Sequence, residues 1–317
     1  MKTAQGTKKA DLFGLLGIFG TLALMAATLI LSERAAGAAQ KGLLLCGKTL
    51  IPAIFPFLVL NGLLMRLGFP EWIGRRIGKP VGRLFGISPA CVAAVVVGLF
   101  SGFPTGAAAA HRICQGGLGS DGDRNRTVLL SSVAAPGFLI VGIGGGMLDS
   151  PHRGLALYLF QLAAIVTVGI VNARLFGHRA EGALPVPVPR RKSLFLALGD
   201  ALRDAADATV GICGAVIFFS ALGGMIALLP LPDSLTCLLV CFLEITSGAS
   251  LAASLLPAPL AFVMIAGAVG WAGCSVHAQT VMVTDGKLKV GGYLLSKCLT
   301  ALLTALFAAA ALFFGFV

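Results

Sequence analysis

Charged side chains are scarce in this chain of 317 residues, because Asp, Glu, Lys and Arg make up only 12% of it. An ordinary soluble protein has about 25%. Hydrophobic residues reach 57%, the mean hydropathy is +0.94, and apolar runs recur along the whole length. Many of these runs approach the ~20 residues needed to cross a bilayer. The composition therefore predicts an all-α, polytopic membrane protein whose main surroundings are the lipid bilayer, with no separate soluble domain.

Signatures of catalysis and of metal binding are also missing. The eight cysteines form no CxxC pair, and the patterns HExxH, GxSxG and the P-loop are absent. We therefore expect no catalytic residues, no metal and no cofactor, and we do not expect an enzyme. The net charge of +11 comes from short segments between apolar runs, where Lys and Arg set membrane topology. Nucleic acid is therefore not an expected partner.

The order of apolar runs predicts two halves that follow an N-terminal transmembrane helix in residues 1–35. The apolar core of that helix, residues 12–31, is longer than the 7–15 residues of a cleaved signal peptide. A basic, Pro-rich linker at 177–192 separates a first repeat (36–176) from a second (193–317). The first repeat has apolar runs at 42–68, 88–112, 127–148 and 154–176, with a basic amphipathic piece at 69–86. The second has a short piece at 193–210 and runs at 209–231, 235–256, 259–283 and 292–316.

Two runs contain a Ser-Gly turn, "LFSGFPTGA" at 99–107 and "LEITSGASL" at 243–251. Basic clusters flank the run at 88–112, so both clusters are cytoplasmic only if that run enters the membrane and returns to the same side. The connections flanking 235–256 carry no Lys or Arg, which predicts a second re-entrant hairpin from the opposite face. The result is seven spans, two re-entrant helical hairpins and two inverted repeats, an architecture typical of secondary transporters.

The two hairpin tips are the main candidate site. A half-membrane of ~15 Å equals ~10 helical residues, so each tip is expected near the midplane. The helix N-termini that follow the tips, with backbone amides in 102–106 and 247–249, are expected to bind carboxylates. An ionisable side chain in a span is a functional candidate, so we assign Glu244 to coupling or gating. The alternative is that Glu244 caps its hairpin by accepting hydrogen bonds from the amides of residues 246–248.

Two more interrupted runs add candidates. "SSVAAPGFLIVGIGGG" (131–146) is predicted to break at Pro136-Gly137, although Pro-Gly could simply kink a packed span. "GAVGWAGCSVHAQTVMV" (267–283) carries polar residues that could orient a substrate, although its histidine could equally be a packing residue. The candidate substrate-binding residues are Ser101, Gly102, Phe103, Pro104, Thr105, Gly106, Ser131, Ser132, Pro136, Glu244, Thr246, Ser247, Gly248, Ser275, His277 and Gln279.

Five segments, taken in order and spacing, carry a family resemblance: "AAQKGLLLCGKTLIPAIFPFLVLNGLL" (38–64), "GLFSGFPTGA" (98–107), "SSVAAPGFLIVGIGGGM" (131–147), "FLEITSG" (242–248) and "AGCSVHAQTVMV" (272–283). The chain resembles the YlbJ-like sporulation integral membrane protein family, whose halves are nucleoside-recognition (Gate) domains. The resemblance implies a fold similar to concentrative nucleoside transporters and a role in moving dipicolinic acid across the outer forespore membrane. The chain departs from the family pattern at Phe103 and Ala135, where the family tends to have polar residues.

Together these observations favour a secondary transporter of a small organic anion, with dipicolinic acid as the substrate that the resemblance implies. The alternatives are a nucleoside or other metabolite transporter, and a non-transporting sporulation membrane assembly protein. The expected location is the bacterial cytoplasmic membrane or the outer forespore membrane. Protons and sodium ions both remain open as the coupling ion, and a homo-oligomer remains open as the assembly.

Overall fold

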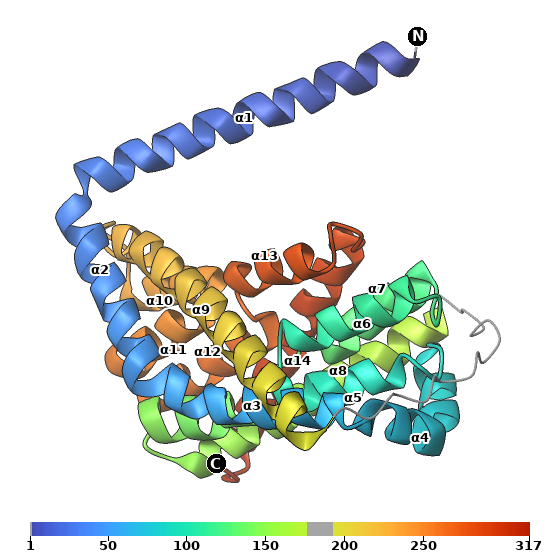
Figure 1. Cartoon of the computed structure of the whole chain (residues 1–317). Coiled ribbons are helices and arrows are strands. Elements are labelled where there is room, and N and C mark those ends of the chain that lie inside the picture. Colours follow the sequence, from blue (N-terminus) through green and yellow to red (C-terminus); the bar gives the residue numbers. More distant parts are fainter. Residues whose placement is uncertain (1, 176–192) are drawn as a thin grey trace.

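The computed structural model describes residues 2–175 and 193–317, and every regular element in these ranges is helical (Figure 1). The predicted linker at 177–192 lies outside the described residues. The chain before the linker contains the N-terminal helix α1 (Lys2–Ile30), and then α2 (Ser32–Leu45), the π-helix η1 (Cys46–Leu50), α3 (Ile51–Arg66), α4 (Phe69–Phe85), α5 (Val92–Ser101), α6 (Thr105–Gln115), α7 (Asp121–Ser131), the π-helix η2 (Phe138–Gly145) and α8 (Pro151–Leu175). The second half contains α9 (Leu194–Ile226), α10 (Asp233–Leu243), α11 (Ile245–Leu255), α12 (Ala258–Trp271), α13 (Cys274–Val283) and α14 (Val290–Phe313).

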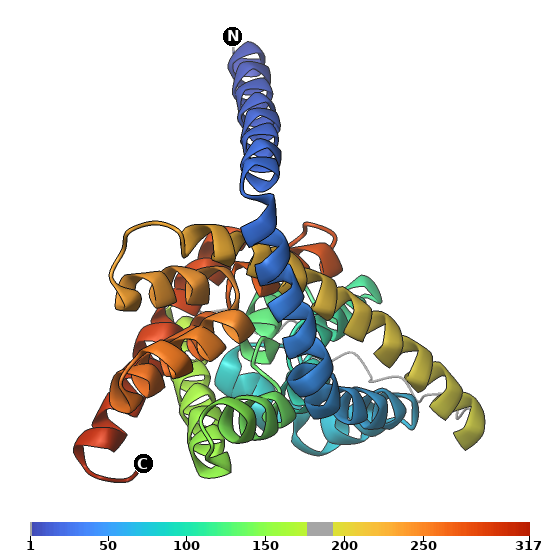
Figure 2. The same ribbon diagram turned by 90° about the vertical axis from the view of Figure 1, so that its left-hand side faces the viewer.

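Five helical segments are long and apolar enough to cross a bilayer. They are Ser32–Arg66, Pro151–Leu175, Leu194–Ile226, Ala258–Val283 and Val290–Phe313. The prediction of an all-helical, polytopic protein is thereby confirmed. The remaining helices pack into one bundle with these segments, whereas α1 extends away from the bundle in both views (Figures 1 and 2).

Helix α14 shows the polarity expected of a chain in lipid. Leu299, Leu302 and Leu306 lie on its exposed face, and Thr300 and Thr304 on its buried face. The threonine hydroxyls donate to backbone carbonyls one turn earlier, so they are satisfied inside the helix. Because lipid cannot hydrogen-bond to a polar side chain, polar groups gather inside the bundle and apolar ones face outward.

Helices α5 and α6 form a helical hairpin within residues 88–115, the region predicted to be re-entrant. Its start and its end lie together, because the Ser88 amide donates to Asp123 Oδ1 at 2.9 Å and the Ser88 hydroxyl donates to the carbonyl of Leu118 at 2.8 Å. Arg126 adds a third contact by donating to the carbonyl of Gly86 at 2.7 Å. The chain therefore leaves α6 at the same end of the molecule at which it entered α5.

Helices α10 and α11 also pack against each other, and Glu244 alone separates them. The helices approach closely at Gly248, where an added Cβ would lie 2.4 Å from the Cα of Cys241. Only a glycine allows this contact without a shift of the backbone. The predicted break in each run is confirmed, whereas entry of the hairpins into the membrane from opposite faces stays a prediction.

The structure adds to or corrects the sequence predictions in three details. The piece at 193–210 and the run at 209–231 form the single helix α9, because no Pro or Gly-Pro signal interrupts them. The run at 259–283 is broken at Ala272 and Gly273, whose φ angles are 80° and 86°. The break in 131–146 covers residues 132–135 and ends where Pro136 begins the next helical turn, a position that proline tolerates because its missing N–H is not needed there.

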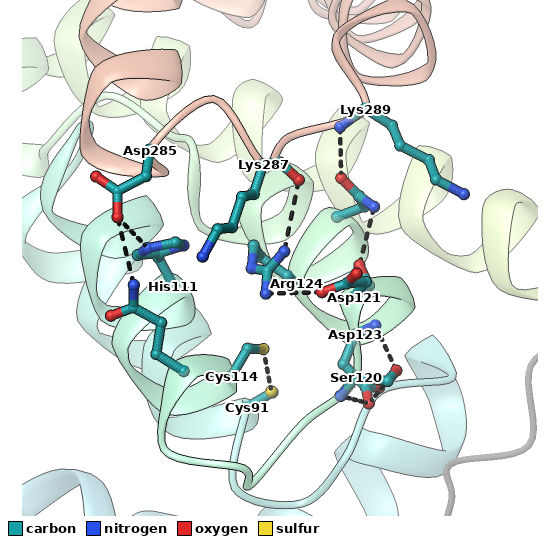
Figure 3. A network of polar contacts seen from close by, with 12 residues as sticks. Cys91, His111, Cys114, Ser120, Asp121, Asp123, Arg124, Asp285, Lys287 and Lys289 are labelled. Atoms are coloured by element: carbon teal, nitrogen blue, oxygen red, sulfur yellow. Dashed lines mark hydrogen bonds and ion pairs between the residues drawn. The ribbon is translucent and has the colours of Figure 1, made fainter.

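The segment between α13 and α14 joins the two halves at the open end of the first hairpin (Figure 3). His111 of α6 contacts Asp285 through Nε2 and Oδ2 at 3.1 Å. The Lys289 amide donates to Asn125 Oδ1 of α7 at 2.8 Å. The basic segments at 112–126 and 287–289 therefore lie at one end of the molecule, in agreement with their predicted placement on one side of the membrane.

Candidate functional site

A small cavity lies between the two hairpin tips, and we call it the inner cavity. Its volume is about 50 Å³, and its polar lining comes from both halves: Ser101 beside the first tip, Glu244 and Thr246 at the second, and Ser275 and Gln279 on α13. The rest of the lining is apolar: Leu50, Ile54, Leu58, Phe103, Ala135, Phe138, Ile212, Val216, Ile245 and Val276. The two predicted tips therefore meet at one place, although they are about 140 residues apart in the sequence.

Each tip rests on the break in the span that follows it. At the first tip the Phe103 amide donates to the carbonyl of Val133 at 2.9 Å, and a Cβ added to Gly102 would lie 2.6 Å from the amide nitrogen of Ala135. At the second, a Cβ added to Gly273 would lie 3.1 Å from the Cα of Glu244. Backbone thus lies against backbone at both crossings, and at the first the hydrogen bond satisfies part of the main chain that a broken helix leaves unpaired.

Glu244 caps the helix that it precedes. Its side chain is buried, and its two carboxylate oxygens accept from the amides of Thr246 at 2.8 Å and Ser247 at 2.6 Å. The carbonyl of Glu244 accepts from the amide of Gly248 at 3.0 Å. The capping interpretation of Glu244 is therefore confirmed. The amide of Ser247, one of those expected to bind a substrate carboxylate, is already bound to a carboxylate of the chain itself.

At the first tip, a side-chain hydroxyl is available for hydrogen bonding, whereas the amides of Gly102 and Gly106 are already used. The amide of Gly102 donates to Gly98 and that of Gly106 to Gly102, at 2.7 and 3.4 Å. Ser101 is buried, it lines the inner cavity, and its hydroxyl has no hydrogen-bond partner in the described part of the chain. A buried hydroxyl without a partner is costly. Ser101 therefore leaves an unused hydrogen-bonding group in the wall of the inner cavity.

The other candidate residues lie around the inner cavity. Ser131 packs behind the first tip, where Gly98 and Gly106 leave room for its side chain. Ser132, the first residue of the break in the first half, and His277 of α13 are both buried. The candidates that do not line the inner cavity are Gly102, Pro104, Thr105, Gly106, Ser131, Ser132, Pro136, Ser247, Gly248 and His277.

A buried lysine is the residue that the sequence predictions missed. Lys297 of α14 is fully buried and donates to the carbonyl of Ser132 at 3.0 Å, inside the break of the first half. In the described residues it forms no ion pair with a carboxylate. Nearby, His277 Nδ1 lies 3.2 Å from the hydroxyl of Tyr293, while His277 Nε2 has no hydrogen-bond partner among the described residues. A lone lysine in an apolar run was the available signal, as it was for Glu244.

Gln161 of α8 links the broken spans of the two halves. Its carboxamide oxygen accepts from the amide of Ala134 at 3.1 Å, and its nitrogen donates to the carbonyl of Val269 at 3.0 Å. The side chain is fully buried. The oxygen of this carboxamide thus binds the break after α7, and its nitrogen binds the last turns of α12.

The relationship of the chain to known proteins agrees with this architecture. No protein-family model and no solved structure matches it. The chain is similar to the sporulation integral membrane protein YlbJ of Bacillus subtilis (strain 168), with 23% identity over 328 residues that cover 89% of this chain and 79% of the relative. The resemblance stated from the motifs is confirmed by this match. The chain is therefore a multi-pass integral membrane protein that is similar to this sporulation protein over most of its length.

Proposed function

We propose that this protein is a secondary transporter of a small organic anion, with dipicolinic acid as the substrate during sporulation. The observation that carries the proposal is the inner cavity, where two helix breaks from different halves meet around buried polar groups. Discontinuous helices that meet around a substrate site at the repeat interface are typical of secondary transporters. The sporulation setting comes from the name of the relative, and the substrate from the family resemblance.

The matching order of elements supports inverted repeats. Each half has a helical hairpin, then a span broken near its middle, then an unbroken span: α5 and α6, then α7 and η2, then α8 in the first half, and α10 and α11, then α12 and α13, then α14 in the second. In each half an aromatic side chain donates to a carbonyl near the end of the first hairpin helix. Tyr158 donates to Leu99 and Trp271 to Phe242, both at 2.9 Å. We propose that the hairpins enter the membrane from opposite faces.

The size of the inner cavity supports an occluded state. A volume of about 50 Å³ holds a few water molecules, because one water needs roughly 10–15 Å³ by this measure. Sites for small molecules span about 300–1,000 Å³. Transport by this route therefore requires a hairpin to move away from the break that it contacts.

The experiment uses the purified full chain in liposomes with an imposed proton or sodium gradient. Labelled dipicolinate is expected to accumulate above the level of protein-free liposomes, and labelled uridine is not. Ser101→Ala removes the unpaired hydroxyl and is expected to raise the KM, while Thr28→Ala on exposed α1 serves as the matched hydroxyl deletion.

Each other result rejects the proposal in favour of a named alternative. Accumulation of uridine instead of dipicolinate indicates a nucleoside transporter. Failure to accumulate either compound, together with normal spore dipicolinate in a deletion strain, indicates an assembly protein.

A further inference from the structure

We propose that a groove between α2, α9 and α11 is a second binding site, which takes a small organic dianion. This inference rests on the proposed function and extends it by naming the charge class of the ligand and the residues that attract it. We call the site the outer groove, and the helices that form it lie side by side in Figure 1.

The outer groove has the size of a ligand site. Its volume is about 490 Å³, within the roughly 300–1,000 Å³ of small-molecule sites and well above the inner cavity. Apolar side chains of α2, α10 and α11 form one part of its wall, among them Leu45, Val240 and Leu251. Such a wall suits the ring or hydrocarbon body of an organic ligand.

The charge of the outer groove has one sign. Lys41 and Lys48 line it, and no Asp or Glu does. Neither lysine forms an ion pair with any carboxylate in the described ranges. Two unpaired ammonium groups beside an apolar wall favour an anion and disfavour a cation.

The spacing of the lysines favours two negative charges over one. Seven residues separate Lys41 and Lys48, which corresponds to ~10 Å along a helix. Both side chains are long and exposed, so they can converge on the two carboxylates of one molecule. A monocarboxylate pairs with one lysine and leaves the other unpaired.

Serine hydroxyls of α11, the helix that follows the second hairpin tip, also line the outer groove. Ser247, Ser250 and Ser254 line the groove from one face of α11, because they are three and four residues apart. The Ser247 hydroxyl lies 2.5 Å from that of Ser220, while its amide binds the carboxylate of Glu244. Ser247 therefore faces the outer groove, and Glu244 and Thr246, next to it, face the inner cavity. The N-terminus of α11 is the wall between the two spaces.

The test compares two double variants. One carries Lys41→Gln and Lys48→Gln, and the control carries Lys287→Gln and Lys289→Gln. The second pair removes the same charge from the far connection shown in Figure 3. Uptake is measured in phosphatidylcholine vesicles. An exposed ion pair contributes ~1.5- to 5-fold in affinity, so the first pair of substitutions is expected to raise the KM for dipicolinate about 2- to 30-fold at unchanged kcat. For picolinate, which has one carboxylate, the KM is expected to rise less than for dipicolinate. For the control variant no change in KM is expected.

A second measurement does not need transport. The thiol introduced by Ser250→Cys, with the exposed native thiol removed by Cys298→Ser, is expected to react with a maleimide and to be protected by dipicolinate. Protection without transport keeps the outer groove and rejects the proposed transport function. Transport without protection, or with an unchanged KM in the double variant, rejects the outer groove.

Anionic lipid headgroups are also negatively charged and could bind the two lysines, so a separate experiment tests them. If the two lysines alter uptake only in vesicles that contain phosphatidylglycerol, they bind lipid phosphate and the dianion site is rejected. If the effect persists in pure phosphatidylcholine, the soluble anion is the ligand.

Discussion

Replacement of Glu244 by Gln separates the capping role of this residue from a transport role. The carboxylate accepts from two amides, at 2.8 and 2.6 Å, and the residue is 1% exposed. A Gln side chain has one acceptor oxygen, so one of the two amides loses its partner in a buried site. Loss of a charge-assisted bond and burial of an unpaired N–H together cost about 2–4 kcal/mol. The free energy of unfolding should fall by this amount.

Trp271 provides the assay, since it donates to the carbonyl of Phe242 and stacks on its ring with centroids 5.0 Å apart. In a Trp72→Phe background it is the remaining tryptophan, and its fluorescence reports on melting next to the second tip. Glu244→Asn is the control, because Asn is among the preferred N-cap residues and should retain part of the stability. If Glu244→Gln melts like the wild type while uptake is lost, the carboxylate acts in transport and the capping argument fails.

Three further substitutions test other contacts. Lys297→Met removes a buried amine that forms no ion pair within the described residues, so it should raise the melting temperature and reduce uptake. Full uptake at unchanged stability would contradict a functional role. Gly102→Ala should lower the free energy of unfolding by about 1–3 kcal/mol, because φ is 74° and ψ is −170°, and an unchanged melting temperature would show that the tip is not held in this conformation. Asp285→Asn should cost no more than ~1 kcal/mol in thermal melts, because the carboxylate that contacts His111 is 64% exposed; a larger loss would mean that this contact fixes the two halves.

The sequence was sufficient to locate the hairpin tips. Gly102 next to Phe103-Pro104 must break a helix, and Glu244 in an apolar run requires a local partner. The distribution of Lys and Arg then predicted a re-entrant hairpin at 88–112. The contact of Ser88 with Leu118 shows that the chain folds back there, whereas its return to the same side of a membrane stays a prediction. These signals depend on neighbouring residues alone, so they can be read from the sequence without knowledge of the packing.

The features that sequence reasoning missed depend on contacts between distant segments. The interruption of 267–283 was expected, but its position at Ala272 and Gly273 was not, because no proline marks it and the backbone of Glu244 packs against Gly273 there. The occupation of the α11 amides by the carboxylate of Glu244 follows from side-chain geometry, which spacing does not give. Lys297 carried the same signal as Glu244. Its partner, however, is the carbonyl of Ser132, which lies 165 residues away and is free to accept this hydrogen bond because the helix breaks there.

Gln161 sets a chemical requirement at the centre of the molecule. The position needs an acceptor for the amide of Ala134 and a donor for the carbonyl of Val269 on the same short side chain. Glutamate supplies no hydrogen for the carbonyl when ionised, and methionine supplies neither group. A carboxamide thus couples the two broken spans, and any rearrangement that parts Ala134 from Val269 must first find new partners for both.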